Sequence, residues 1–363
     1  MKKSSIQNES IKQRYFFLLR QRKGRDPKTI AIAERAIALY QLFSNDADFA
    51  TFNMDKAVAY KEDYLLKIIN NGQPLSLTTR LMYLQDLQRF LRWMIKQPGY
   101  KRRITEDDIE CLNISTKERR IASQNNPQPL PDLDYVVTLA GSIEVKSIID
   151  QRDQALIAFT YLSGMRDEAI ISLPLGCLNI KELVINQDPQ QGVLTKFSKR
   201  IPGIIFNFDD VLLQYLIAWV DLLIKKGWGP KDPLFPQSKR SRKPGDLFYC
   251  TATDIERKPW KDTESLRDIF MERSKTAKLP YFPPKAFRSS AVLLALDFAK
   301  TGKEIKAISQ CFGHEFVATT LACYGNLLDD QLIKTLKGIC FQKKEPTGKD
   351  KKLEQIAKVL REE

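Results

Sequence analysis

The 363-residue sequence predicts a mostly α-helical protein with two domains, and three observations indicate this. Apolar residues recur at helical spacing through most of the chain. A polar segment at residues 116–131, rich in Pro, Asn, Gln and charge, lacks apolar periodicity and is typical of a linker. Strand-like runs are confined to the second half, at Leu183–Asn186, Val193–Phe197 and Ile204–Phe208. We therefore expect a helical domain, a linker, and a larger, mostly helical domain with one small sheet.

Residues 1–115 are expected to form the N-terminal domain, a small bundle of helices with short connections. The first twelve residues are polar and are expected to be frayed. Asp26-Pro27 favours a helix start, and Asn70-Asn71-Gly72 favours a helix end. The expected helices are Ile11–Lys23, Thr29–Phe43, Met54–Ile69 and a fourth from Ser76 to Pro98.

The second domain is expected to span residues 132–345. It begins with a helix after Asp132 and continues with a strongly apolar helix near Arg152–Ser163, closed by Gly164. Residues 228–262 are basic and predicted to be loop-rich, and the tail at 346–363 carries a small amphipathic helix, Leu353–Leu360. The other expected helices are Asp167–Leu173, Asp209–Gly227, Thr263–Thr276, Lys285–Lys300, Lys303–Phe312 and Asp329–Leu336.

The charge of the chain indicates a polyanionic partner, most simply nucleic acid. The net charge is +14, and basic chains of this kind bind phosphate backbones. Residues 1–125 hold 23 Lys and Arg against 14 Asp and Glu, so this third of the chain supplies +9 of the excess. We expect it to contact phosphates, with a merely basic soluble surface as the alternative.

Several classes of protein have no support in the sequence. No apolar run approaches the ~18 residues that span a bilayer, and no secretion signal begins the chain, so we expect a cytosolic protein without membrane contact. The six cysteines form no C-x-x-C pair and are expected to be reduced. Motifs for nucleotide hydrolysis, dinucleotide binding and zincin chemistry are absent. The single histidine, His314, excludes a multi-histidine metal site.

Six residues nevertheless carry chemistry suited to a phosphodiester. Two are arginines that can present paired donors while staying charged, and the others are lysines, the histidine and a tyrosine. They are Arg166, Lys196, Lys285, Arg288, His314 and Tyr324. Singly, each has an ordinary explanation: a helix-end or salt-bridge arginine, a surface lysine, a satisfied histidine or a core tyrosine.

Taken in order, these residues resemble the tyrosine recombinase (phage integrase) family. The shared pattern is an arginine, a lysine, a [His or Lys]-x-x-Arg box, Gly-His, and a tyrosine ten residues after the histidine, within CFGHEFVATTLACYGN. The resemblance covers nearly the whole chain. It implies a helical core-binding (SAM-like) domain, followed by a mainly helical catalytic domain with a small three-stranded antiparallel sheet.

The same resemblance implies a site-specific DNA recombinase or integrase, of the kind carried by mobile elements. Tyr324 would form a 3′-phosphotyrosine, and rejoining would need no ATP, metal or other cofactor. Arg166 and Arg288 would stabilise the charged phosphorane, with His314 and Lys285 as further donors. Lys196 would protonate the 5′ oxygen, with Lys199 as the alternative. The implied partners are double-stranded DNA and three further copies of the chain, a homo-tetramer on paired sites, with room for accessory DNA-binding proteins.

Two departures from the family pattern stand out. Lys285 occupies a position that is usually histidine, and Ala169 occupies one that is usually acidic, with Glu168 one place early. The alternative from another class is a non-catalytic DNA-binding protein, either a relative without strand cleavage or a helix-turn-helix regulator. A type IB topoisomerase would share the chemistry without a defined site.

Overall fold

The computed structural model describes residues 3–70, 72–123, 129–242 and 250–322. Contacts divide the chain into two compact units, Met1–Asn126 and Pro127–Glu363. Each has its own hydrophobic core. Both are mainly helical, and the predicted fold class is confirmed.

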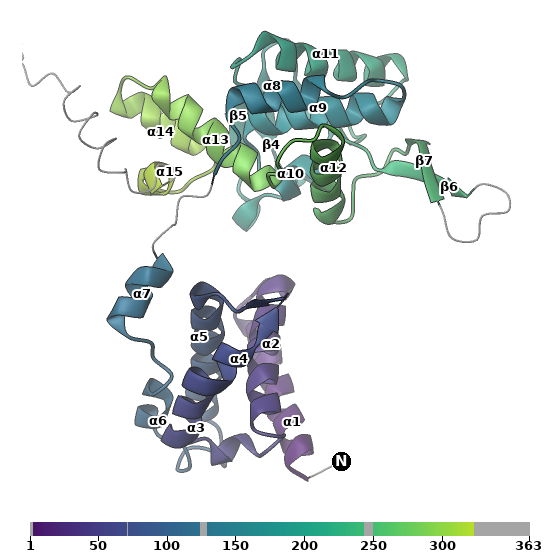
Figure 1. Ribbon diagram of the computed structural model, residues 1–363. Helices are drawn as coiled ribbons and strands as arrows, with labels where there is room; N and C mark the ends of the chain where they lie inside the picture. The colour runs from purple at the N-terminus through teal and green to yellow at the C-terminus, as the bar shows by residue number, and fades with distance from the viewer. Residues whose placement is uncertain (1–2, 71, 124–128, 243–249, 323–363) are drawn as a thin grey trace, which may run out of the picture. The chain divides into compact units, whose positions relative to one another are not determined.

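The N-terminal unit is a helical bundle with one two-stranded ribbon (Figure 1). Its α-helices are α1 (Lys3–Phe17), α2 (Pro27–Phe43), α3 (Met54–Ala59), α4 (Leu65–Lys67), α5 (Leu77–Met94), α6 (Glu106–Glu110) and α7 (Thr116–Ser123). Two π-helical turns, η1 (Leu18–Arg22) and η3 (Tyr60–Tyr64), extend α1 and α3, and η2 (Phe49–Thr51) is a 3₁₀ turn. The ribbon pairs β1 (Ile69–Asn70) with β2 (Gln73–Pro74).

The expected frayed start is wrong, because α1 begins at Lys3. The reason is one polar side chain. Asn8 is fully buried, its amide donates to Ala47 O at 2.8 Å, and its oxygen accepts from Phe49 N at 3.1 Å. These two hydrogen bonds fix the first turns of α1 to the segment that follows α2. The predicted start at Asp26-Pro27 is confirmed, with the Asp26 carboxylate capping the first turn of α2.

The first half of the segment expected to be a linker is helical. Ser115 and Glu118 cap each other reciprocally at the start of α7: Ser115 N and Oγ donate to the Glu118 carboxylate, and Glu118 N donates to Ser115 Oγ. This S-x-x-E capping box stabilises a helix that apolar periodicity alone does not reveal.

The second unit is built around α9 (Ile148–Ser163), whose residues from Arg152 to Ser163 are all buried. Helices α8, α11 and α13 pack against it, and Figure 1 shows α8 and α11 running along it. The helices of this unit are α8 (Leu133–Gly141), α9, α10 (Asp167–Ile171), α11 (Asp210–Lys225), α12 (Glu264–Thr276), α13 (Pro284–Asp297), α14 (Gly302–Cys311) and α15 (Val317–Leu321). The expected helix at Asp329–Leu336 lies outside the described residues, as does the tail helix Leu353–Leu360.

A three-stranded antiparallel sheet in the order β3-β4-β5 lies beside these helices. Its strands are β3 (Leu178–Asn179), β4 (Val184–Gln187) and β5 (Ile201–Ile204), with Ile185 opposite Gly203. The sheet was predicted, but two of its strands were misplaced. Residues 193–195 are not in a strand, and Lys196–Ser198 form a 3₁₀ turn (η6). The third strand ends at Ile204, the residue where the expected strand begins. Two further 3₁₀ turns are η4 (Leu175–Cys177) and η5 (Pro189–Gln191).

The region expected to be loop-rich contains a β-hairpin, β6 (Ser238–Arg242) with β7 (Cys250–Ile255). A buried arginine anchors its start: Arg152 donates to Pro236 O at 3.0 Å and to Ser238 Oγ at 2.8 Å. Arg152 also pairs with Asp153 at 2.7 Å, and Arg273 binds the same carboxylate at 2.6 Å. A charge as deeply buried as Arg152 requires such partners.

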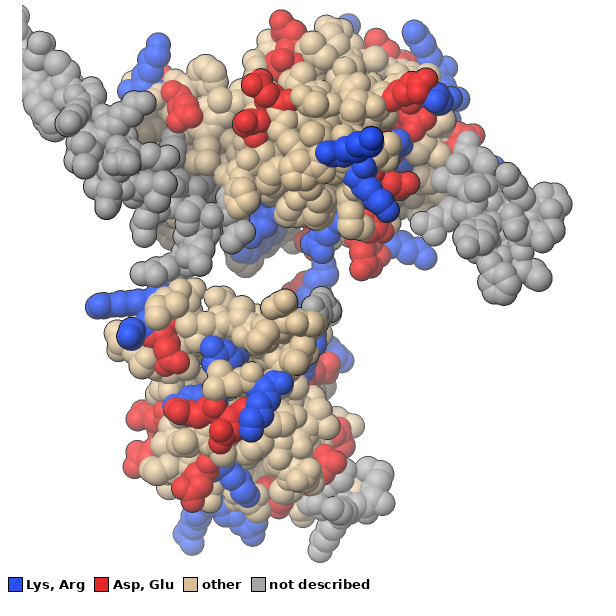
Figure 2. Space-filling model, in the orientation of Figure 1, with Lys and Arg blue, Asp and Glu red and all other residues tan. Residues whose placement is uncertain are grey.

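Figure 2 shows basic and acidic side chains intermixed on the visible face of the N-terminal unit. This face therefore does not display the basic excess as one continuous patch. Among the described residues, no helix is both long enough and apolar enough to cross a bilayer.

Candidate active site

Three of the candidate residues, Arg166, Arg288 and His314, lie around one junction in the second unit, where the end of α14 meets the turn between α9 and α10. Gly164 ends α9 in the left-handed conformation, at φ +54°. A Cβ atom at this position would lie 2.1 Å from Phe312 Cε1. Glycine is therefore required both by the backbone and by the phenylalanine ring that packs on it.

Gly313 provides the second close approach. Its φ is +64°, and a Cβ there would lie 2.5 Å from Ile201 Cδ1 and 3.3 Å from Arg166 Nη1. The loop between α14 and α15 thus lies directly against the first residue of β5 and against the Arg166 guanidinium. These contacts fix the position of His314, the next residue.

Arg288 joins the three segments. It lies in the second turn of α13, and its guanidinium donates to Gly164 O through Nη1 and to Phe312 O through Nη2, the latter at 2.7 Å. Nη2 also lies 3.0 Å from His314 Nε2, and the guanidinium carbon lies 5.4 Å from the centroid of the Phe312 ring. One side chain therefore ties the end of α9, the end of α14 and the histidine together.

Arg166 lies at the start of α10, where it is the residue before the first helical turn. It is partly buried, and its Nη2 donates to Gly313 O at 3.5 Å. Burial lowers the pKa of the Arg166 guanidinium. Arg166 and Arg288 bind neighbouring carbonyls of one loop, so two guanidiniums converge on it.

The hydrogen bonds of His314 define its tautomer. Nε2 faces Arg288 Nη2, which can only donate, so Nε2 must accept and carries no proton. Nδ1 lies 2.8 Å from Thr320 Oγ1 and therefore carries the ring proton, which it donates to the hydroxyl. In this arrangement His314 is a neutral imidazole with its acceptor nitrogen toward the arginines. To donate a hydrogen bond from Nε2 to a phosphate, as the expected donor role would need on this side of the ring, His314 must first gain a proton there.

The electrostatics agree with a neutral ring. Burial, followed by the charges of Arg288 and Arg166, lowers the pKa of His314 to about 4. Desolvation and nearby positive charge both disfavour the imidazolium form. His314 should therefore stay uncharged at neutral pH.

The two candidate lysines lie at the edge of this cluster. Lys285 is exposed on the first turn of α13, three residues before Arg288, which places both on one face of the helix. Within the described ranges, no hydrogen bond or ion pair holds its ammonium. Lys196 begins the η6 turn and is exposed, with its Nζ 5.1 Å from the centroid of the Phe197 ring. The ammonium of Lys199, in the same turn, pairs with Glu315 at 3.5 Å.

Tyr324 lies outside the described residues, so the structure does not place the expected nucleophile. The family's usual acidic position is filled by Ala169, which is buried, and Glu168 is exposed. Asp167, the first residue of α10, is partly buried, and burial raises its pKa while Arg267 and Arg288 oppose that effect. Asp167 could therefore supply the negative charge that the family's usual acidic residue, here Ala169, does not provide.

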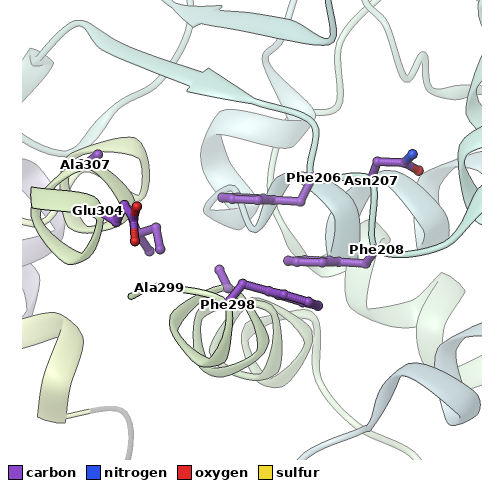
Figure 3. Close-up of a pocket in the computed structure, with 9 residues that line it drawn as sticks. Phe206, Asn207, Phe208, Phe298, Ala299, Glu304 and Ala307 are labelled. Carbon is purple, nitrogen blue, oxygen red and sulfur yellow. The ribbon is translucent and has the colours of Figure 1, made fainter. Parts of the chain in front are cut away.

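A groove of about 390 Å³ lies next to the site and is mostly apolar. Figure 3 shows the rings of Phe206, Phe208 and Phe298 stacked along it. Phe206 also stacks on Phe312 at 5.5 Å, so the aromatic column supports the residue that packs on Gly164. Glu304, at the groove, caps α14 by accepting from Thr301 N. The residues that line the groove therefore help to hold Phe312 in place, and most of them are apolar.

Sequence reasoning missed the parts of the site that act through the backbone. The carbonyls of Gly164, Phe312 and Gly313 hold the arginines, and a carbonyl leaves no trace in a sequence pattern. Thr320 was not among the predicted site residues, yet its hydroxyl accepts from His314 Nδ1 and so fixes the histidine tautomer. In the parts of the chain that the structure describes, no three His, Cys, Asp or Glu side chains are arranged to hold a metal ion.

Comparison with known proteins finds similarity in structure alone. No protein-family model matches the chain, and no curated protein matches it by sequence. A lambda integrase dimer bound to a COC′ core site matches with a TM-score of 0.60 and 13% identity, over 93% of this chain and 80% of that one. The Tn1549 transposon integrase in complex with a circular intermediate DNA matches with a TM-score of 0.57 and 14% identity, over 91% and 99%.

A lambda integrase tetramer bound to a Holliday junction also matches, with a TM-score of 0.58, 13% identity, and coverage of 85% of this chain and 77% of that one. At this level of identity the similarity concerns the fold. It extends through most of the chain. The chain has the tyrosine recombinase/integrase fold.

Proposed function

We propose that this chain, which has the fold of the lambda and Tn1549 integrases, is a site-specific DNA recombinase that acts through a tyrosine nucleophile. The observation that carries the proposal is that Arg166 and Arg288 both bind the loop from Phe312 to His314, and that Arg288 also contacts the His314 ring. Two guanidiniums and one imidazole in a partly buried junction match the needs of a phosphorane.

The chemistry follows from charge. Attack on a DNA phosphodiester adds negative charge to the non-bridging oxygens, and donors fixed in advance stabilise that charge. In this structure Arg288 and Arg166 donate hydrogen bonds to backbone carbonyls, at N–H groups that a phosphate oxygen could accept from instead. We infer that a phosphate competes for the same guanidinium hydrogens and binds them more strongly, because ionised acceptors form the stronger hydrogen bonds.

Tyr324, ten residues after His314, is the proposed nucleophile. Its oxygen forms a bond to phosphorus, and the bond from phosphorus to the 5′ oxygen breaks. The hydroxyl proton needs an acceptor, and we propose the unprotonated Nε2 of His314, although its lowered pKa makes the ring a weak base. Lys196 then supplies a proton to the departing oxygen. The phosphotyrosine keeps the energy of the broken bond, so rejoining uses no ATP.

The related structures hold dimers and tetramers on DNA. We propose the same partners here: double-stranded DNA, with copies of the chain assembled as a homo-tetramer on two paired sites. The two compact units would both contact the duplex, and the +9 excess in residues 1–125 would bind phosphates. Accessory DNA-binding proteins fit the proposal without being required by it.

Covalent capture tests the proposal. The protein is incubated in EDTA with a pool of duplexes randomised on both sides of a nick, so that a cleaved strand loses its short fragment and cannot be rejoined. Adducts that survive denaturation are isolated and sequenced. We expect adducts that share one sequence. Tight binding without adducts would favour the non-catalytic DNA-binding protein, and adducts of unrelated sequence would favour a topoisomerase.

A further inference from the structure

The turn that carries Lys196 has an unusual backbone. Phe197 and Ser198 are both left-handed, at φ +63° and +50°, which few residues other than glycine adopt at low cost. Hydrogen bonds hold the turn closed: Thr195 Oγ1 donates to Lys199 O at 2.7 Å, and Ser198 N donates to Thr195 O at 3.1 Å. Phe197 is left 74% exposed. Strained backbone of this kind often marks a functional position.

Two ammonium groups lie over the Phe197 ring, but their surroundings differ. Lys196 Nζ is 5.1 Å and Lys199 Nζ is 6.0 Å from the ring centroid. Lys199 also pairs with Glu315 at 3.5 Å. Among the described residues, no carboxylate pairs with Lys196. To reach a leaving oxygen, Lys199 would have to give up its ion pair, whereas Lys196 would give up only a ring contact.

Glu315 directly follows His314, so the ion pair connects the lysine turn to the histidine loop. A second contact lies next to it. Ile201, two residues after Lys199, is buried against Gly313. The turn is therefore attached to the loop at two points, one apolar and one ionic. The apolar contact fixes the start of β5, and the ionic contact fixes the turn itself.

We infer that Glu315 is a positioning residue for leaving-group protonation. By pairing with Lys199 it holds the η6 turn against the His314 loop and leaves Lys196 as the acid. This inference rests on the proposed function. In the step concerned, the Tyr324 oxygen bonds to phosphorus and the electron pair of the broken P–O bond goes to the 5′ oxygen. A proton from Lys196 Nζ neutralises that oxygen and leaves a neutral amine.

The size of the effect follows from the exposure of the pair. The Lys199 and Glu315 side chains are 50% and 59% exposed, and exposed ion pairs contribute little. Losing the pair should slow cleavage by about fivefold, the rate equivalent of about 1 kcal/mol. Losing the acid itself should slow cleavage by roughly 100-fold to 10,000-fold. The two roles are therefore separable by magnitude.

The experiment measures single-turnover cleavage of the captured site, with either a normal 5′ oxygen or a 5′-bridging sulfur that leaves without a proton. Wild type is compared with Lys196→Ala, Lys199→Met, Glu315→Gln and the double variant Lys199→Met/Glu315→Gln. Glu144→Gln, which breaks another exposed pair, with Lys146 at 2.7 Å, serves as the matched control and should leave the rate unchanged.

With oxygen, we expect a large loss for Lys196→Ala and about fivefold losses for Lys199→Met, Glu315→Gln and the double variant alike, because both single changes break the same pair. With sulfur, all four variants should approach the wild-type rate. A large, sulfur-rescued loss for Lys199→Met would make Lys199 the acid and overturn the inference. A wild-type rate for Glu315→Gln, additive losses in the double variant, or losses that sulfur does not restore would also overturn it. If wild type forms no adduct on any DNA, the proposed function fails instead.

Discussion

The single histidine makes the centre of the proposed site directly observable. His314 is the only imidazole in the chain, so its two ring nitrogens give an unambiguous pair of ¹⁵N resonances. The perturbation is a pH titration from 8 to 4 of protein labelled at histidine. The structure predicts that Nδ1 carries the proton at neutral pH and that the ring titrates near pH 4, since burial and two arginines lower its pKa to about 4.

The lowered pKa of His314 also makes the stability of the folded protein depend on pH. A histidine with a lowered pKa in the folded state binds protons more readily when unfolded. Stability is therefore fully present above the unfolded pKa of about 6.5 and is lost as the pH falls toward 4. The full difference corresponds to at most about 3 kcal/mol. Because the ring is only partly buried, solvent screening reduces this to roughly 1–2 kcal/mol.

Urea unfolding at pH 7 and pH 5 measures this loss of folding free energy. His314→Asn is the control, because its carboxylates titrate as those of wild type do and only the histidine is missing. Wild type should lose more stability than the variant over this interval. Replacing Arg288 with alanine should raise the histidine pKa part of the way back, because burial, the larger cause, remains. A midpoint near 6.5 in wild type, or a proton on Nε2, would refute the arrangement described for Arg288 and His314.

Three further outcomes follow from the structure. Gly164→Ala should destabilise the second unit by well over the ~1–2 kcal/mol that a left-handed backbone costs an alanine, because its Cβ would also clash with Phe312. Gly192→Ala is the control: its φ is +91° and nothing lies within 4 Å of its Cβ, so it should show only the backbone cost. Urea unfolding compares the two, and equal losses would contradict the packing of Phe312. Arg152→Leu should cost roughly 3–5 kcal/mol by the same measurement, since it breaks a buried ion pair, and a cost below about 1 kcal/mol would contradict its anchoring of the hairpin. DNA affinity of the full chain should fall more steeply with salt than that of residues 127–363, by ~0.9 in log-log slope for each phosphate contacted; equal slopes would exclude phosphate contacts from the N-terminal unit.

Local signals predicted much of the fold. Asp26-Pro27 marks the start of α2, because caps act within one turn. The capping box of Thr301 and Glu304 at the start of α14 is equally local, although that helix was expected to begin at Lys303. The apolar helix α9 was recognisable from composition alone. The start of α1 was not, because it depends on Asn8, a polar residue that is buried only after the chain folds back on it.

Strand positions and the supports of the site depend on contacts between distant residues. The run at 193–197 has strand-like composition, but the turn at Phe197 removes it from the sheet. Arg166, Arg288 and His314 were predictable as residue types in order along the chain. Their mutual geometry was not predictable, because the arginines are held by the backbone carbonyls of Gly164, Phe312 and Gly313. Every residue has such a carbonyl, so the sequence does not single these three out.

Tyr324 provides the most direct test of the central claim. Phenylalanine removes its oxygen and keeps nearly all of its packing surface, at a cost of about 1 kcal/mol at most if the residue were only structural. Wild type, Tyr324→Phe and Arg288→Ala are each incubated in EDTA with the nicked duplex recovered by capture, and covalent adducts are counted after denaturation. Wild type should form the adduct. Arg288→Ala should form it roughly 100-fold to 1,000-fold more slowly, and Tyr324→Phe should bind the DNA normally and form none. An adduct with Tyr324→Phe would show that another residue is the nucleophile and would contradict the account.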